Sequence, residues 1–233
     1  MRLTLVRHAT LIVETSHGRI LVDPMLRAAG STPAIENTPN QRPNPLVDLP
    51  LPLSPAEVVA GVDLCIVTHL HSDHFDDAAA AVLPRDIPIL TQPESAAALA
   101  ARGFTNVAVE HPSIPVTGGR HGTGEIGEAM GAVSGWVVDG LYIAGDTIWC
   151  DEVQEALDEH RPRAVVLNAS GARFNVGDPI VMDAEDVRRV RAATDAPIAV
   201  VHLEAINHCL EPRSAYRGID RVQVPDNGET IEL

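Results

Sequence analysis

Six consecutive residues, His69 to His74, hold three histidines and one aspartate in the order His-Leu-His-Ser-Asp-His. The run follows the apolar residues 64–67, which are typical of a buried strand. His69 and His71 alternate from a strand end and can therefore point to one place, whereas Asp73 and His74 lie where the chain turns toward a helix. Imidazole and carboxylate groups bind zinc, manganese or iron. The run therefore predicts a metal site, and a solvated loop rich in histidine is the alternative.

The composition favours a globular, acidic protein. The chain has 233 residues, of which 45% are apolar, and this content supports a substantial core and a single domain over residues 1–233. The formal charge of −15, with no basic run, argues against nucleic-acid binding, which needs clustered cations. No stretch is apolar enough for a signal peptide or a membrane helix. We therefore expect a cytoplasmic protein with a small-molecule substrate, and the number of protomers stays open, a homo-oligomer included.

Short β-like runs dominate the first quarter of the chain and predict an antiparallel meander. The segment from Arg27 to Pro55 then carries seven prolines and shows no apolar period. It predicts a long loop, and loops of this length in a compact domain are usually lids or binding segments.

Strands followed by helices predict a layered α/β architecture after this loop. The expected helices are Asp76–Leu83, Pro93–Arg102, Asp151–His160 and one that is capped by Asp183. The expected strands cover residues 63–69, 87–90, 131–138, 141–146, 164–170 and 198–204, with a further one near Val107.

The segment from His121 to Ala144 is rich in glycine, and we expect it to be β-like. The pair Asp139-Gly140 predicts a tight hairpin turn. Gly122, Gly124 and Gly127 match the dinucleotide-binding spacing, but the following residues make a poor helix, so a turn is expected there rather than a cofactor site.

Other candidate site residues occur singly. His121, Asp146 and His202 each follow or end an apolar run and could project from one sheet edge. Taken alone, such a residue is more often structural. Further candidates are Glu204 and His208 beside a substrate, with His208 as a proton donor, and Asn168 and Arg173 as contacts to an anionic group. For each of these four, a structural role or a surface ion pair is the alternative.

The remaining histidines and the cysteines give weaker signals. His8 and His17 show no partner in the sequence, and His111 and His160 are expected to be exposed. The three cysteines are an odd number at wide spacing, which predicts reduced thiols, Cys65 being a core residue.

Taken together, the motifs resemble the metallo-β-lactamase superfamily. The order His-x-His-x-Asp-His, an isolated His, an Asp in the context Gly-Asp-Thr and a last His after a strand matches the ligand series of that family. The flanking segments HATLIVETSHGRILVDPML and GDPIVMDAEDV resemble the branch of L-ascorbate-6-phosphate lactonase-like hydrolases. The residues around His121 differ from the Pro-Gly-His-Thr-Pro-Gly context of other members, so the resemblance does not extend to the substrates of glyoxalase II or true β-lactamases.

The resemblance implies a four-layer αββα sandwich with two divalent ions, Zn²⁺ or Mn²⁺ with iron as a further option. It implies that His69, His71 and His121 bind one ion, that Asp73, His74 and His202 bind the other, and that Asp146 bridges them. Asp23 would support the metal loop from behind.

The activity implied is a metal-dependent hydrolase, in which a metal-bound hydroxide oriented by Asp73 cleaves an ester, lactone or phosphodiester in a small molecule. A di-iron redox enzyme on the same ligands is the alternative, although the 233 residues leave no room for a flavin domain. A metal-binding protein without catalysis is a third possibility.

Overall fold

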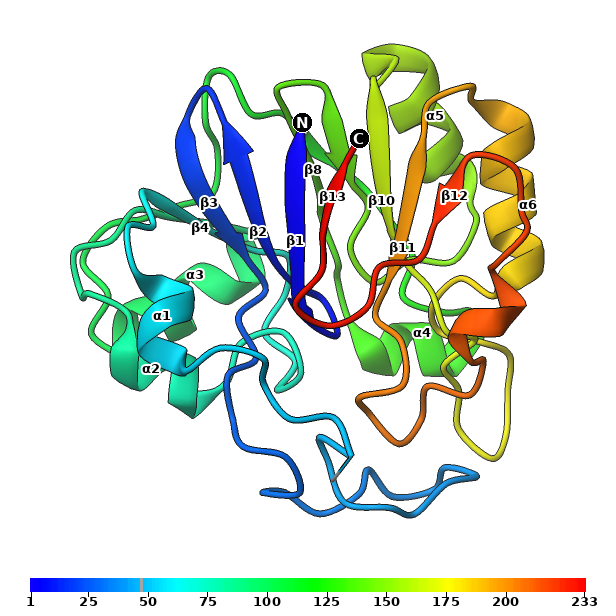
Figure 1. Cartoon of the computed structure of the whole chain (residues 1–233), viewed down its shortest axis with the longest axis horizontal. Helices are drawn as coiled ribbons and strands as arrows, with labels where there is room; N and C mark the ends of the chain where they lie inside the picture. The colour runs from blue at the N-terminus through cyan, green and yellow to red at the C-terminus, as the bar shows by residue number, and fades with distance from the viewer. Residues whose placement is uncertain (47) are drawn as a thin grey trace.

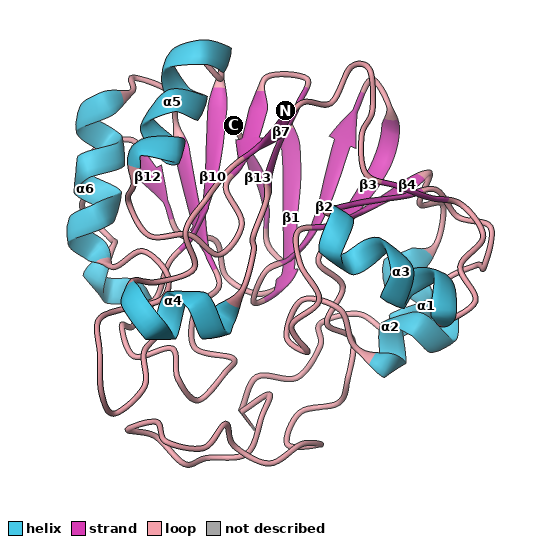
Figure 2. Ribbon diagram, turned by 180° about the vertical axis from the view of Figure 1, so that it is seen from behind, coloured by secondary structure: helices cyan, strands magenta, loops and turns pink. Residues whose placement is uncertain are grey.

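Two β-sheets pack face to face, and helices cover the outer face of each. The computed structural model describes residues 1–46 and 48–233. Figure 1 shows helices α1, α2 and α3 beside the first sheet and helices α5 and α6 beside the second, and the reverse view in Figure 2 shows the same separation. The expected four-layer αββα sandwich is therefore confirmed.

The first sheet has seven strands in the order β13-β1-β2-β3-β4-β5-β6. Its first three strands in the chain pair antiparallel, as the sequence predicts, and β3, β4, β5 and β6 run parallel. The strands are β1 Arg2–Arg7, β2 Thr10–Thr15, β3 Gly18–Val22, β4 Leu64–Val67, β5 Ile89–Thr91, β6 Val107–Ala108 and β13 Thr230–Glu232.

The second sheet has six strands in the order β12-β11-β10-β9-β8-β7. The hairpin between β8 and β9 is confirmed: Asp139 and Gly140 both adopt positive φ, at 49° and 78°, as a tight turn of this type requires. The strands are β7 Val116–Thr117, β8 Gly135–Val138, β9 Leu141–Ile143, β10 Ala164–Asn168, β11 Ile198–Val201 and β12 Val222–Gln223.

Alternation along the strands gives both faces of each sheet an apolar surface. Leu3, Leu5, Val138 and Val166 belong to the core between the sheets. Strand residues that point to the opposite face, such as Leu21, pack instead against the helices. Because both faces are covered, the strands consist of nearly continuous apolar runs.

Most helices begin and end where the sequence predicts, and two were missed. The helices are α1 Pro55–Val59, α2 Asp77–Val82, α3 Pro93–Ala101, α4 Gly124–Met130, α5 Asp151–His160 and α6 Ala184–Ala193. Helix α1 has a capping box, in which Ser54 and Glu57 bind each other's backbone N–H groups, and this signal stands in the sequence. The expectation of β-like structure after His121 is wrong, because helix α4 occupies this segment. Residue 127 must be glycine there, since a Cβ at this position would lie only 2.8 Å from the Gly122 backbone.

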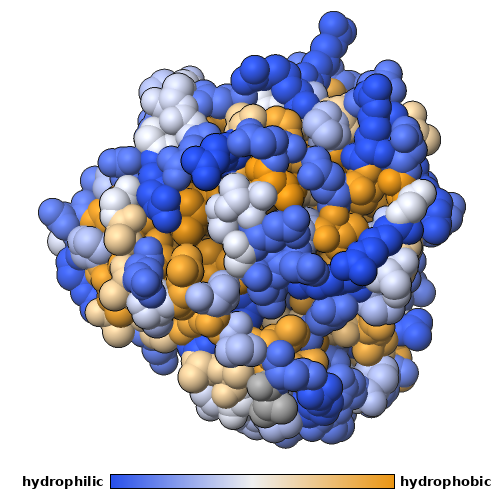
Figure 3. Space-filling view, in the orientation of Figure 1, coloured by the Kyte–Doolittle hydropathy of each residue, from blue (hydrophilic) through white to orange (hydrophobic). Residues whose placement is uncertain are grey.

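Hydrophilic side chains dominate the rim of the face in Figure 3, and the apolar groups there lie between them. Among the described residues, no helix is long and apolar enough to span a membrane.

The described residues of the Pro-rich segment 27–55 form the predicted long loop up to the start of α1, and the side chain of Asn207 fastens this loop. The Asn207 amide donates to the Thr38 hydroxyl at 2.6 Å and to the Ile35 and Asn40 carbonyls at 2.9 and 2.5 Å. Its oxygen accepts from Ile35 N and from the Asn44 amide. The loop is therefore held against the segment after β11.

Replacing Asn207 with Ala should loosen this loop. Several buried polar groups would lose their partners at once, and one such loss costs about 1–3 kcal/mol. We expect a lower midpoint of chemical unfolding and faster limited proteolysis within residues 35–44. N175A is the control, because the exposed Asn175 contacts the loop only through its backbone N–H. Equal proteolysis of N207A and the native protein would show that Asn207 does not hold the loop.

Candidate metal centre

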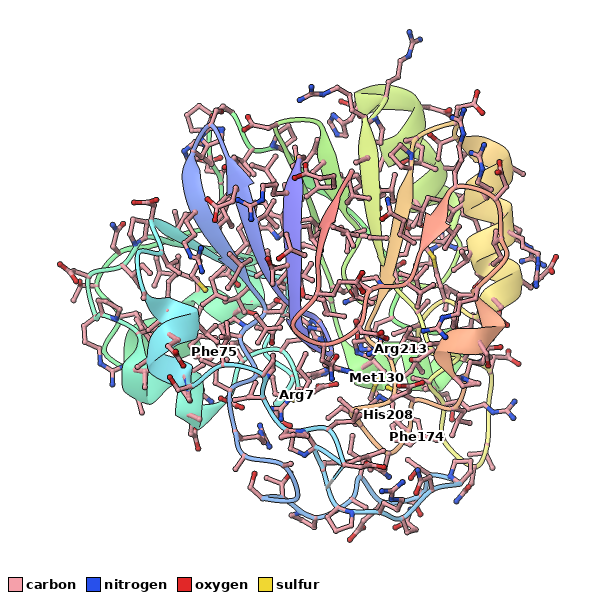
Figure 4. The ribbon with its side chains drawn as sticks, in the orientation of Figure 1. Arg7, Phe75, Met130, Phe174, His208 and Arg213 are labelled. Atoms are coloured by element: carbon pink, nitrogen blue, oxygen red, sulfur yellow. The ribbon has the colours of Figure 1, made fainter. Side chains whose placement is uncertain are left out.

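The candidate residues converge at one edge of the two sheets. The loop after β4 supplies His69, His71, Asp73 and His74, whereas Asp146 follows β9 and His202 follows β11. Figure 4 shows this region at the lower edge of the sheets, beside the labelled Met130, Phe174 and His208. Parallel strands end at the same edge of a sheet, so residues far apart in the sequence meet there.

A first cluster consists of three imidazoles. The Nε2 atom of His69 lies 3.0 Å from Nδ1 of His71, and Nε2 of His121 lies 3.3 Å from the same atom. Two nitrogens bound to one tetrahedral ion, each at 2.0–2.1 Å, lie about 3.4 Å apart. These three nitrogens therefore have the spacing of donors that share a cation.

A second cluster consists of Asp73, His74 and His202. The Asp73 Oδ2 atom lies 3.9 Å from Nε2 of His74 and 3.7 Å from Nε2 of His202. All three residues are buried, and together with His8 they form a group with donor spacing. The Nε2 atom of His202 is fully buried and makes no hydrogen bond of normal geometry among the described residues, although Asp146 Oδ2 lies 3.2 Å from it. This atom is therefore available to bind a cation.

Asp146 lies between the two clusters. Its Oδ2 atom is 3.1 Å from Nε2 of His74 and 3.2 Å from Nε2 of His202. The same atom is 3.6 and 4.0 Å from the Nε2 atoms of His121 and His69. One oxygen thus reaches donors of both clusters, which is the position that a bridging ligand needs.

Hydrogen bonds from behind orient these donors. Asp23 Oδ2 accepts from Nδ1 of His74 at 2.8 Å and from the Thr68 hydroxyl at 2.8 Å, and that hydroxyl accepts from Nδ1 of His69. Nδ1 of His121 donates to the Ile180 carbonyl at 2.8 Å. In His69, His74 and His121 the Nδ1 atom is occupied in this way, so Nε2 is the atom available to a cation, and such outer partners raise ligand basicity.

The carboxylates shift the pKa values of the central imidazoles. Burial opposes a charge on His74, but Asp146, Asp23 and Asp73 outweigh it and raise its pKa to about 10. Burial likewise opposes a charge on His202, and Asp146 together with its other neighbours raises that pKa well above the usual value. Without a cation, protons therefore balance the buried carboxylates, and the donor set fits divalent ions that would replace them.

Of the four residues that the sequence suggested beside a substrate, only His208 is among the described residues that line the cavity beside the clusters. The Asn168 amide donates to Asp146 Oδ1 at 2.7 Å and orients the carboxylate, and Asn168 is not among the described residues that line the cavity. Glu204 binds Arg213 through two hydrogen bonds of 3.1 Å and lines a different hollow. Arg173 is exposed and is not among the described residues that line the cavity.

His8 shows no partner in the sequence, and the structure buries it in the second cluster. Its Nε2 lies 3.2 Å from Asp73 Oδ2 and its ring lies on that of His202. Burial lowers the pKa of His8 to about 3, so its imidazole is neutral. Cys65 is a buried core residue, the three thiols are free and His111 is exposed, as expected. His160 was expected to be exposed and is instead half-buried as the last residue of helix α5.

The cavity beside the clusters is small and partly apolar. Its volume is about 200 Å³. It is lined by Ile35, His71, Ser72, Asp73, His121, Met130, Asp146, Phe174, Ile180 and His208. Both clusters contribute to its wall, so a molecule in the cavity contacts them directly.

The sandwich fold and the His/Asp cluster at its edge define a class, that of hydrolases which depend on bound metal ions. The family model of the beta-lactamase superfamily domain matches residues 2–200. The chain therefore belongs to the metallo-β-lactamase superfamily, as the motifs suggest.

Relatives of similar length agree on this class. The UPF0173 protein YddR of Bacillus subtilis is 37% identical, with 99% of each chain covered. Two crystal structures cover 100% of this chain and 99% of their own: an isothiocyanate hydrolase from Delia radicum gut bacteria, at 34% identity and a TM-score of 0.93, and a possible metal-dependent hydrolase from Veillonella parvula, at 30% and 0.92. The protein is thus a metal-dependent hydrolase.

Adding zinc to the metal-free protein at pH 7.5 should release protons. The pKa of His74 is raised to about 10 and that of His202 well above its usual value, and each imidazole must lose its proton to bind a cation. We expect up to one proton from each imidazole, and the contribution of His74 should disappear as the pH rises through about 10. Titration calorimetry in two buffers of different ionisation enthalpy measures the release. Zinc binding without proton release at pH 7.5 would contradict this charge balance.

Proposed function

We propose that the enzyme hydrolyses a small, uncharged molecule with an electrophilic carbon, and that an organic isothiocyanate is the first substrate to test. We assign two cation sites, His69, His71 and His121 to one, Asp73, His74 and His202 to the other, with Asp146 between them. The observation that carries the proposal is the cavity that opens onto both clusters.

The lining of the cavity selects for an uncharged and partly apolar substrate. Ile35, Met130, Phe174 and Ile180 form its apolar wall. The 17 basic residues of the chain are all arginines, and none lines the cavity among the described residues. A phosphate group would therefore lack a cationic side chain to bind it. This argues against a phosphodiester and against the phosphorylated substrate of the lactonase-like branch.

The size of the cavity supports the same class. A volume of about 200 Å³ admits a small molecule only, since ligand pockets for drug-sized molecules have about 300–1,000 Å³. Isothiocyanates, simple esters and lactones of this size share an electrophilic carbon. The isothiocyanate is preferred because a structure of 34% identity that covers the whole chain is an isothiocyanate hydrolase.

The cations and two side chains have distinct roles in this proposal. When bound, a divalent cation lowers the pKa of a water molecule from about 15.7 to about 7 and so supplies a nucleophile at neutral pH. Asp73 lines the cavity, and its carboxylate is held ionised: burial opposes the charge, but His74, His202 and His8 keep its pKa well below the usual value. It can accept a hydrogen bond from the attacking water and so orient it.

His208 lies where charge develops on the substrate. Burial lowers the pKa of His208 to about 4, so its imidazole is neutral at pH 7. A neutral imidazole donates a hydrogen bond but is a poor acid, so we assign His208 to stabilising the developing negative charge rather than to protonating a leaving group. This revises the role that the sequence suggested.

The reaction balances with one water molecule. The water oxygen bonds to the central carbon of R–N=C=S, and its protons pass to the nitrogen. The C–N bond then breaks, which leaves an amine and carbonyl sulfide. No redox partner is needed.

The test is a substrate panel with metal content measured beforehand. We expect the zinc-loaded or manganese-loaded protein to hydrolyse small isothiocyanates, to accept uncharged esters or lactones more slowly and to leave phosphodiesters intact. Metal-stripped protein should be inactive. F174A should raise KM for apolar substrates, whereas V176A, at a residue that is 74% exposed on the same segment, should not. Preferred turnover of phosphodiesters would refute the proposal, and a redox-active di-iron centre would favour the redox alternative.

Replacing His208 tests its role as a hydrogen-bond donor. H208A should lower kcat by about 100-fold, the usual loss when one donor to a developing charge is removed. H208Q keeps an N–H group and should retain most of the activity. Both variants should bind the native amount of zinc. If kcat of H208A equals that of the native enzyme, His208 has no part in the reaction.

A further inference from the structure

His8 contacts two ligands of the second cation site at once. It lies in the tight turn between β1 and β2, and its side chain is 1% exposed. Its Nε2 atom is 3.2 Å from Asp73 Oδ2. Its ring centroid is 3.7 Å from that of His202, with 39° between the ring planes. One side chain therefore touches residues that are 65 and 194 positions away in the sequence.

The backbone strengthens this connection. The His8 carbonyl accepts a hydrogen bond of 2.8 Å from the N–H of His202. Both residues have positive φ, at 61° and 67°, a conformation that costs free energy in residues other than glycine. Such strain persists only where the surroundings enforce it, and it clusters at functional sites. The first sheet thus holds a ligand of the second sheet in place.

The geometry separates His8 from the imidazoles that we assign as ligands. The ring centroids of His74 and His202 are 5.3 Å apart, those of His71 and His121 are 5.1 Å apart and those of His69 and His71 are 4.4 Å apart, all longer than the 3.7 Å between His8 and His202. His8 instead lies over the face of His202. Both imidazoles assigned to the second site place Nε2 within 3.2 Å of Asp146 Oδ2, whereas no ion pair joins His8 to Asp146 among the described residues.

We propose that His8 is a positioning residue that determines whether the second cation site can fill. Its Nε2–H donates to Asp73 Oδ2 and fixes the carboxylate, while its ring face and carbonyl fix His202. This inference rests on the proposed assignment of two cation sites. The first site, made of His69, His71 and His121, has no contact with His8 among the hydrogen bonds of the described residues.

The test compares the zinc occupancy of His8 variants at a fixed free zinc concentration. H8F keeps an aromatic face but loses the donor, and H8Q places an amide N–H near the position of Nε2. We expect two zinc ions per chain in the native protein and in H8Q, and one in H8F, with the second Kd raised about 10–100-fold as for other residues that orient ligands. H17Q is the control, because His17 lies in the next turn of the chain, between β2 and β3. Its imidazole contacts Asp139, which belongs to neither cluster.

Elemental analysis counts the ions, and the visible spectrum of the cobalt-substituted protein reports the geometry of each site independently of activity. Native protein that binds fewer than two ions would refute the two-site assignment itself. Native protein with two ions and H8F with two ions of unchanged Kd would refute the role of His8 alone. Loss of both ions in H8F, with an unchanged melting temperature of the metal-free protein, would also refute it.

A second pair of variants covers the case in which H8F does not fold. H8N places its amide near Nδ1, away from Asp73, whereas H8Q reaches Asp73. We expect H8N to bind one ion and H8Q to bind two. Equal occupancy in the two variants would overturn the proposal.

Discussion

Burying three carboxylates around the single imidazole of His74, each with an oxygen within 3.9 Å of a ring nitrogen, is the constraint on which this structure depends. Asp23, Asp73 and Asp146 are each at most 8% exposed, and an uncompensated buried charge is among the costliest features a fold can have. In the metal-free protein, protonated His74 and His202 balance them. Divalent cations supply more charge at the same place, so cation binding also stabilises the fold around the site.

The sandwich makes that arrangement possible because its apolar core lies elsewhere. The two sheets and their helices bury apolar side chains along the strands, and the polar donors are confined to the strand ends. The second cluster draws Asp73 from the first sheet and His202 from the second. The packing of one sheet on the other therefore sets the distances between donors, and the hydrogen bond from His202 N to the His8 carbonyl is a direct link across that packing.

Local patterns predicted the elements well where the signal is local. Helix α5 begins and ends at the residues expected, and the hairpin at Asp139 follows from a two-residue turn. Helix α1 was missed although Ser54 and Glu57 have the capping spacing, because the prolines around it suggested a loop. Helix α4 was missed because its glycines suggest a turn, and the close backbone contact that requires Gly127 is tertiary.

The site residues, too, could be predicted from the sequence where they are neighbours in the chain and not where the fold alone brings them together. His69 to His74 are adjacent and could be recognised from residue types alone. His121, Asp146 and His202 stood out only through the order of motifs in a family, because a single polar residue at a strand end has many structural explanations. Nothing in the sequence pairs His8 with residues on other elements. Asn168 and Glu204 were expected to contact substrate, and their placement beside Asp146 and Arg213 depends on side-chain directions that no motif contains.

The specificity of the cavity has a different structural origin from its chemistry. The donors stand at strand ends that the core fixes, whereas Ile35 and Phe174 belong to loops. Asn207 ties the Ile35 loop to the segment that carries His208, so the apolar wall and the hydrogen-bond donor are held by one network. Changes in these loops can therefore alter which molecule enters without moving a metal ligand, and one hydrolytic centre can serve different small substrates in proteins of this fold.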